Sequence, residues 1–349
     1  MPSIENYARF ILILLISAII NFLLYFLFSN LLDILLEKSM FYLYLYWFIM
    51  AFDNIIALIF AMWIVSKLFP QYNKEKTAKN NELKLTKEIN STNLNQQISP
   101  FFRGLTTKKF PSQLKDGLLL FLCIYIPLDF LSYLIPGVLD YTVNSLNISD
   151  TQDPLNYFLY SFPLMLISTI IVHFFVAVRE EFLYREFFLT IGKDELKSPL
   201  AFFYSSFLFG LAHFNYVFVS SNTDQPIFYP IWWAINGFVI GLVAATYFLK
   251  KQRIFPVIFA HWFNNVFSAV VVRLYFLGYP FWKTTFLWLY IPVLSIAFIL
   301  YITRIFKVKQ YFSIIRENWR NYFSTVENWK FIILDVFILL LLWLFLSVM

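Results

Sequence analysis

Long apolar stretches, separated by shorter polar ones, follow one another along most of this chain. A helix needs roughly 20 apolar residues to cross a bilayer, and about nine stretches come near that length. The pattern predicts helices at residues 8–30, 41–68, 117–138, 157–181, 199–219, 229–249, 254–276, 284–304 and 331–348. The sequence therefore predicts an all-α fold, a polytopic membrane helical bundle with about nine transmembrane helices.

One longer polar stretch, residues 70–115, interrupts this pattern and is rich in Asn, Lys, Thr and Gln. Such a composition buries too little apolar surface to form a core of its own. We therefore expect a boundary there. The predicted parts are two N-terminal transmembrane helices (1–69), a polar basic cytoplasmic linker (70–115), a core (116–305), and an interfacial segment with a C-terminal transmembrane helix (306–349).

The composition agrees with a membrane protein. Of 349 residues, 60% are hydrophobic and 14% charged, and the mean hydropathy is +0.67, whereas soluble domains contain about 25% charged residues. The apolar stretch after Arg9 is long enough to span and lacks an A-x-A site, which is typical of a signal anchor. No phosphate-binding glycine loop or nucleic-acid motif is present, and the single cysteine, Cys123, excludes a disulfide within the chain. The expected partner is the lipid bilayer, not nucleic acid.

Basic residues are concentrated in alternate polar segments. If the N-terminus and the 70–115 linker are cytoplasmic, the segments 179–198, 250–253 and 304–330 fall on the same side. All but three of the 27 Lys and Arg residues then lie there; the exceptions are Lys38, Arg273 and Lys283. Cytoplasmic loops carry such an excess. We therefore predict a cytoplasmic N-terminus and, with nine spans, an external C-terminus.

Charged residues at the end of one apolar stretch are the first candidates for chemistry. The segment V-R-E-E-F-L-Y-R-E-F-F-L, from Val178 to Leu189, follows about twenty apolar residues, and ionisable groups inside a membrane are costly and often functional. Glu181 and Arg185 are four residues apart, so they share a helix face and can pair. Glu180 points about 100° away from Glu181 and is not neutralised by that arginine. It therefore remains available as a base.

Two further motifs bring histidine into predicted spans. Phe209 and His213 are spaced i, i+4, and so are His261 and Asn265. A single histidine on an apolar helix is more often a core residue, but all three histidines of the chain lie in predicted spans. We interpret His173, seven residues before Glu180, as structural. We interpret Asp53 and Asp129 in the same way.

Glu180, His213, His261 and Asn265 together suit hydrolysis of an acyl bond. A carboxylate can take a proton from water, and histidine or asparagine can donate hydrogen bonds to the oxyanion that develops. The same donors also suit a divalent metal such as zinc, with His213 and His261 as ligands, although no HExxH motif is present. The residues alone leave both a metal-assisted and a metal-free mechanism open.

The three motifs, in this order on successive helices, resemble the CPBP family, which contains type II CAAX prenyl proteases and bacteriocin-processing or immunity (Abi) proteins. The resemblance covers about residues 115–305. It implies an intramembrane endopeptidase, by convention a metalloprotease, that cleaves a membrane peptide or a lipidated tail at a site open to the cytoplasm. It also implies that Glu180 is the general base, that His213 positions the water, and that His261 and Asn265 form the oxyanion site. Glu181 and Arg185 are the supporting pair.

Two other functions place similar residues in membrane helices. A non-catalytic bacteriocin immunity protein would bind its partner without hydrolysis, but such a protein has no need to keep all four catalytic residues. A proton-coupled transporter would show a broken helix or an internal repeat, and the sequence shows neither. The endopeptidase is therefore the preferred hypothesis.

Overall fold

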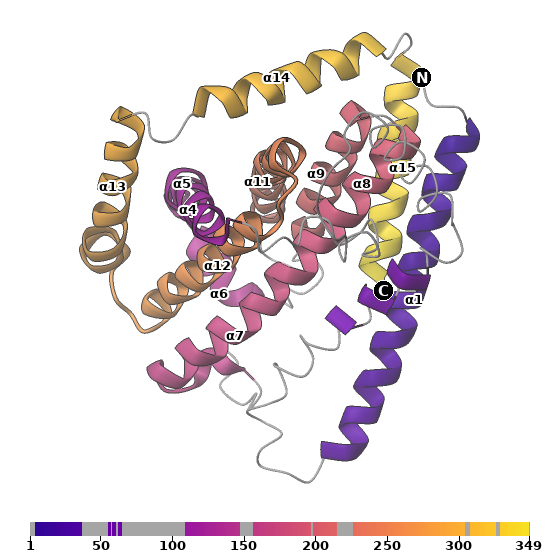
Figure 1. Ribbon diagram of the computed structural model, residues 1–349. Helices are drawn as coiled ribbons and strands as arrows, with labels where there is room; N and C mark the ends of the chain where they lie inside the picture. Colours follow the sequence, from indigo (N-terminus) through magenta and orange to yellow (C-terminus); the bar gives the residue numbers. More distant parts are fainter. Residues whose placement is uncertain are drawn as a thin grey trace.

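The computed structural model describes residues 4–36, 55–56, 58–60, 62–64, 109–146, 156–196, 198–214, 226–303, 308–325 and 329–348. Within these ranges all regular structure is helical, which confirms the all-α fold (Figure 1). Four described helices are long and apolar enough to cross a membrane, or five if one bent pair is a single span. Most of the expected 41–68 helix and of the 70–115 linker lies outside the described residues, so the count of nine remains a prediction.

The longest candidate span runs from Phe162 to Leu196, 35 residues without a break. It consists of α7 (Phe162–Glu181), a π-helical stretch (Phe182–Phe188) and α8 (Leu189–Leu196). We expected a helix ending at residue 181 and a cytoplasmic loop over 179–198, and this prediction is wrong. The chain continues as helix because Arg185, Glu186 and the aromatic residues around them are buried rather than exposed to water.

Four other segments form the core together with this helix (Figure 1). They are α9 (Ser198–Phe214), α11 (Phe228–Lys251), α12 (Phe255–Phe276), and the continuous run of α4 (Phe110–Leu120), a π-helical stretch (Phe121–Tyr125) and α5 (Ile126–Tyr133). The helices α9, α11 and α12 begin within two residues of the predicted starts. By contrast, α4 begins at Phe110, whereas we expected the core and its first span to begin at 116 and 117. The helix extends into the expected linker because this part packs against the core: the ring of Phe110 lies 5.0 Å from that of Phe255, and Gln113 is buried.

The predicted 117–138 span is shorter at its other end. After α5 the chain turns through Gly137, which has a φ of 82°, into α6 (Val138–Ser145). The two segments meet at 99°. Glycine adopts this backbone conformation readily, and a Cβ on Gly137 would meet the hydroxyl oxygen of Tyr229 at 2.1 Å. The short helix α6 therefore lies across one end of the bundle.

Helices α9 and α11 approach each other closely through glycine. A Cβ on Gly210 would meet the carbonyl oxygen of Ala234 at 2.6 Å, and one on Gly237 would meet Nδ1 of His213 at 3.0 Å. One turn further along α11, a Cβ on Gly241 would meet the carbonyl oxygen of Ser206 at 2.9 Å. Small residues four apart allow membrane helices to pack backbone to backbone. This packing brings His213 directly against α11.

The remaining helices lie outside this core: α1 (Ile4–Leu36), the π-helical stretch Phe281–Tyr290 with α13 (Ile291–Ile302), α14 (Val308–Thr325) and α15 (Trp329–Val348). Helix α14 crosses one end of the bundle in Figure 1, where we expected an interfacial segment. A buried carboxylate, Asp335 on α15, holds several of these helices together. It accepts hydrogen bonds from Tyr7 (2.9 Å), Tyr204 (3.2 Å) and Tyr322 (2.8 Å), on α1, α9 and α14.

Candidate active site

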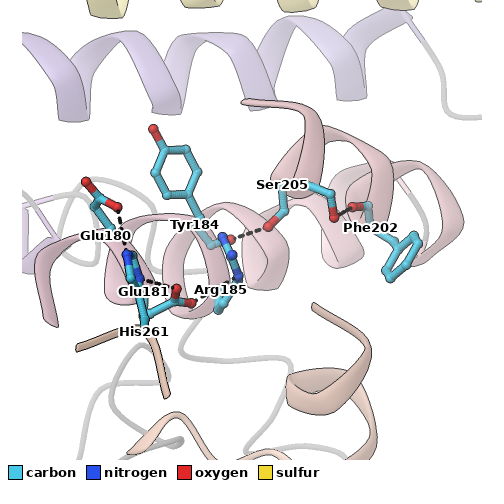
Figure 2. Close-up of polar contacts among 8 residues, drawn as sticks. Glu180, Glu181, Tyr184, Arg185, Phe202, Ser205 and His261 are labelled. Atoms are coloured by element: carbon cyan, nitrogen blue, oxygen red, sulfur yellow. Dashed lines mark hydrogen bonds and ion pairs between the residues drawn. The ribbon is translucent and has the colours of Figure 1, made fainter. Parts of the chain in front are cut away.

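The side chain of His261, on α12, lies between two glutamates of α7 (Figure 2). Its Nδ1 lies 2.9 Å from Oε1 of Glu181, a hydrogen-bond distance. Its Nε2 lies 3.6 Å from Oε2 of Glu180, which is too long for a hydrogen bond. Because an ionised carboxylate only accepts, Nδ1 carries the proton donated to Glu181. Glu181 therefore fixes the orientation of the ring and directs Nε2 toward Glu180.

The expected ion pair between Glu181 and Arg185 is present. Arg185 Nε lies 3.1 Å from Glu181 Oε2, and both side chains are 0% exposed. The guanidinium carbon of Arg185 also lies 4.3 Å from the centre of the Phe209 ring, a cation–π contact that is strongest where water is excluded. Removing one partner of a buried pair strands the other charge, at about 3–5 kcal/mol. The position of His261 thus depends on a charge balance inside the bundle.

Glu180 differs from Glu181 in that its side chain is 24% exposed. It faces a cavity of about 180 Å³ that extends between α7, α9, α11 and α12. The other three predicted catalytic residues, His213, His261 and Asn265, line the same cavity. The cavity thus brings together residues from three helices, up to 85 positions apart in the chain. The cavity is large enough to admit water to Glu180.

His213 presents a defined nitrogen to this space. Its Nδ1 lies 2.8 Å from the carbonyl oxygen of Phe209, and because a carbonyl only accepts, Nδ1 carries the proton of that bond. In the neutral ring Nε2 is then an acceptor. The Phe209 ring lies 4.8 Å from the His213 ring and 5.7 Å from the His261 ring, centroid to centroid. One phenylalanine therefore packs against both histidines and Arg185.

The cavity also contains polar residues that the motifs did not predict as part of the site. Asn264 and Asn236 line it, and the ring of Tyr125 lies 6.3 Å from that of His261. His173, which we interpreted as structural, lines it too, with Nε2 3.3 Å from the hydroxyl of Tyr157. The neighbour of a motif residue, as in Asn264 beside Asn265, was the one sequence signal available for them.

In the π-helical stretch after Glu181, a backbone carbonyl accepts a hydrogen bond from a side chain of another helix. Ser205 on α9 donates to the carbonyl oxygen of Tyr184 at 2.6 Å (Figure 2). The Tyr184 ring packs edge to face on Phe209, with centroids 5.3 Å apart. Single π-helical turns occur often at functional sites. Here the wider turn carries Arg185 into the bundle interior, beside Glu181 (Figure 2).

The donor set does not match a metal site built from three protein ligands. In the described part of the chain no three His, Cys, Asp or Glu side chains come together in a suitable arrangement. Nδ1 of His261 is bonded to Glu181 and Nδ1 of His213 to Phe209. Each histidine thus has only Nε2 to offer. The chemistry proposed below uses the chain's own residues.

The comparisons with known proteins agree with the motifs. Residues 162–267 match the family described as type II CAAX prenyl endopeptidase Rce1-like. No curated protein and no solved structure matches the chain. The matched segment begins at the first residue of α7, ends within α12, and includes the four predicted catalytic residues, Glu180, His213, His261 and Asn265. The predicted resemblance to the CAAX protease family is therefore confirmed over residues 162–267, the segment that holds Glu180 and the histidines of the cavity.

Proposed function

We propose that this protein is an intramembrane endopeptidase in which Glu180 activates a water molecule. The observation that carries the proposal is that Glu180, His213, His261 and Asn265 line one cavity inside a helical bundle. The family match over residues 162–267 supports a peptide hydrolase of the CAAX type at the membrane. The substrate in this proposal is a membrane-associated peptide or protein segment.

Each residue has a role that follows from its partners. The Glu180 carboxylate takes a proton from water while Nε2 of His213 accepts the water's other hydrogen bond. The water oxygen attacks the scissile carbonyl carbon. The Asn265 amide and Nε2–H of His261, in its doubly protonated form, donate to the resulting oxyanion. Preorganised donors of this kind are worth roughly 3 kcal/mol each.

The second half of the reaction returns the proton. The tetrahedral intermediate collapses, the C–N bond breaks, and the amine leaves with the proton that Glu180 carries. The products are a carboxylic acid and a free amine, and Glu180 is again ionised. Glu181 and Arg185 touch neither water nor substrate; they hold His261 in place through the 2.9 Å and 3.1 Å contacts.

The test compares Glu180→Gln with Glu317→Gln in the full-length protein in proteoliposomes. Glu317 is an exposed glutamate on α14, so its variant controls for the chemical change. Mass spectrometry follows cleavage of a prenylated CAAX-type peptide and of an unlipidated leader-type peptide. We expect Glu180→Gln to lose at least about 100-fold in rate, as for general acid–base groups, and Glu317→Gln to keep wild-type activity. Unchanged cleavage by Glu180→Gln would refute the proposal. Wild-type biological activity of Glu180→Gln without any product from either protein would indicate a binding protein instead.

A further inference from the structure

Contacts between helix ends define two opposite faces of the bundle. At one face the start of α4 meets the α11–α12 turn: the rings of Phe110 and Phe255 lie 5.0 Å apart, and Tyr247 donates to Asp116 at 2.7 Å. Helices α1 and α14 join the same face, through a contact of Asn6 with the carbonyl of Glu195 and one of Lys250 with Gln310. We call this the basic face, because it holds most of the described Lys and Arg residues outside α7 and the π-helical stretch Phe182–Phe188. They are Arg9, Lys109, Lys115, Lys193, Lys250, Lys251, Arg253, Lys309, Arg316 and Arg320.

The opposite face is formed around α6. Tyr229, at the start of α11, donates to the carbonyl oxygen of Pro136 at 3.1 Å. Tyr275, at the end of α12, donates to Asp140 at 2.6 Å. We call this the α6 face. In the sequence its connecting segment, residues 139–156, has no Lys or Arg. By the positive-inside rule the basic face is cytoplasmic and the α6 face is not.

The cavity belongs to the half of the bundle that is nearer the α6 face. From Glu180 its wall continues to Thr142 and Ser145 of α6 and to Tyr157. On α11 it includes Trp233, five residues after the helix start, and on α12 it includes Val272, four residues before the helix end. These helix ends meet at the α6 face. The hollow therefore extends from the catalytic glutamate toward that face.

Toward the basic face the site is closed by packed side chains. Phe187 follows Glu180 by two turns in the same helix, and Phe202 precedes His213 by three turns on α9. With Tyr204, Phe248 and Ile258 they belong to one buried cluster, each with at most 3% of its surface exposed. Close-packed interiors of this kind leave no channel for a peptide. A substrate from the cytoplasm has no route to Glu180 through this layer.

The charges of the cavity limit what it can hold. Among the described residues that line it none is Lys or Arg, while Asp129 and Glu180 contribute carboxyl groups. The rest of the wall is aromatic, aliphatic or polar without a carboxyl group, including Tyr133, Trp233 and Asn236, and it contains the three histidines. A free C-terminal carboxylate would find no Lys or Arg there, and His261, the cation of the proposed reaction, already has the Glu181 carboxylate as its counter-charge. An unpaired charge in a buried site is costly. The lining fits an uncharged or cationic peptide segment.

We propose that the substrate reaches Glu180 from the α6 face, and that it is an extracytoplasmic peptide segment, uncharged or cationic, cleaved at an internal bond. This inference rests on the proposed endopeptidase function and names the side and the chemistry of its substrate. It differs from the family-based expectation of a site open to the cytoplasm. The charge distribution places the basic face in the cytoplasm, whereas the cavity extends toward the opposite, α6 face.

Cysteine labelling tests the direction of access without relying on activity. In a Cys123→Ser background, Val176→Cys and Ser145→Cys place thiols in the cavity wall, and Lys251→Cys marks the basic face. A charged, membrane-impermeant maleimide is added to right-side-out and inverted vesicles. We expect both cavity thiols to react at least about tenfold faster from the side opposite to that of Lys251→Cys, since the charged reagent does not cross the hydrocarbon. Faster labelling of both from the Lys251→Cys side would overturn the proposal.

Cleavage from defined sides completes the test. Two neutral peptides of the same sequence are compared, each ending one residue after the cleaved bond, one in an amide and one in a free carboxylic acid. Each is added to one side or the other of proteoliposomes in which the orientation of the protein is known. We expect Glu180-dependent product from the α6 face only, and at least about tenfold more from the amide. Product from the basic face only, or preference for the acid, would overturn the inference while leaving the endopeptidase intact. No Glu180-dependent product from either face would refute the endopeptidase, and the labelling result would still decide the direction of access.

Discussion

His261 contacts two carboxylates that differ in their access to water. Glu181 is 0% exposed and paired with Arg185, whereas Glu180 is 24% exposed and faces the cavity. Substituting one glutamate should therefore affect the fold, and substituting the other the reaction. Adjacent residues of the same chemical type thus have different surroundings because the helix turns by about 100° between them.

Glu181→Gln should destabilise the protein much more than Glu180→Gln. The substitution leaves Arg185 without its counter-charge in a site that excludes water, at a cost of about 3–5 kcal/mol. Thermal unfolding in detergent measures the effect, with Glu180→Gln as the matched control on the same helix. Equal unfolding temperatures for the two variants would show that Arg185 does not depend on Glu181.

The spacing of residues within one helix predicted part of this site. Such spacing contains no information on contacts between different helices. The i, i+4 interval predicted the pair of Glu181 and Arg185, which the structure contains. The bond from His261 to Glu181 joins residues 80 positions apart, so no periodicity indicates it. From the sequence, His261 was expected at the oxyanion and Glu181 was expected to contact Arg185 alone. The structure adds that one glutamate contacts both.

At the scale of elements, the position of His213 depends on the glycines of α11. A Cβ on Gly237 would lie 3.0 Å from Nδ1 and 3.2 Å from Cγ of His213, whereas one on Gly241 would meet Ser206 instead. Both glycines belong to the same helix contact. The first should matter for the reaction, and the second for packing alone.

We expect Gly237→Ala to reduce activity by more than its loss of stability explains, and Gly241→Ala to reduce stability with little effect on the rate of folded protein. Overpacking of this kind costs typically 1–3 kcal/mol. Peptide cleavage per folded molecule and thermal unfolding are measured for both variants. The idea is wrong if the two variants lose activity in equal proportion to folded protein.

The tyrosines around Asp335 allow a second prediction about elements. Asp335→Asn replaces one acceptor oxygen by a donor, so the hydroxyls of Tyr7, Tyr204 and Tyr322 compete for a single acceptor. A buried donor without its partner costs about 1–3 kcal/mol. We expect a lower unfolding temperature with cleavage chemistry retained. Asp140→Asn, at an exposed site bonded to Tyr275, is the control and should change the unfolding temperature much less.

The described membrane helices were predicted from the length of the apolar stretches, whereas some helix ends were not. The ends of α11 and α12 lie close to the predicted ones because turn residues and charges there meet water. The continuation of α7 as helix from Phe182 to Leu196 was missed because the charged segment 179–198 was expected to be a cytoplasmic loop. Sequence composition cannot distinguish charges in solvent from charges paired inside a bundle, since both are written with the same residues.

At the scale of the whole molecule, two independent patterns have to be combined. The distribution of Lys and Arg assigns a side to each end of the bundle, and the packing decides toward which end the cavity extends. Neither alone gives the direction of substrate access. The family match covers residues 162–267, the segment that holds the candidate catalytic residues, and contains no information on orientation in a particular membrane.

The unbroken helix from Phe162 to Leu196 has a consequence for the lipid environment. Its 35 residues extend for about 50 Å at 1.5 Å per residue, while the hydrocarbon layer is about 30 Å thick. The helix must tilt or protrude, and a change in bilayer thickness alters that tilt. Because Glu180 lies near its midpoint and the partner His261 lies on another helix, tilting changes their separation from 3.6 Å.

We therefore expect cleavage rates to vary with acyl chain length in reconstituted bilayers, with an optimum at one thickness. A rate independent of chain length between 14 and 22 carbons would contradict this, and the protease would then be insensitive to which membrane of a cell it occupies.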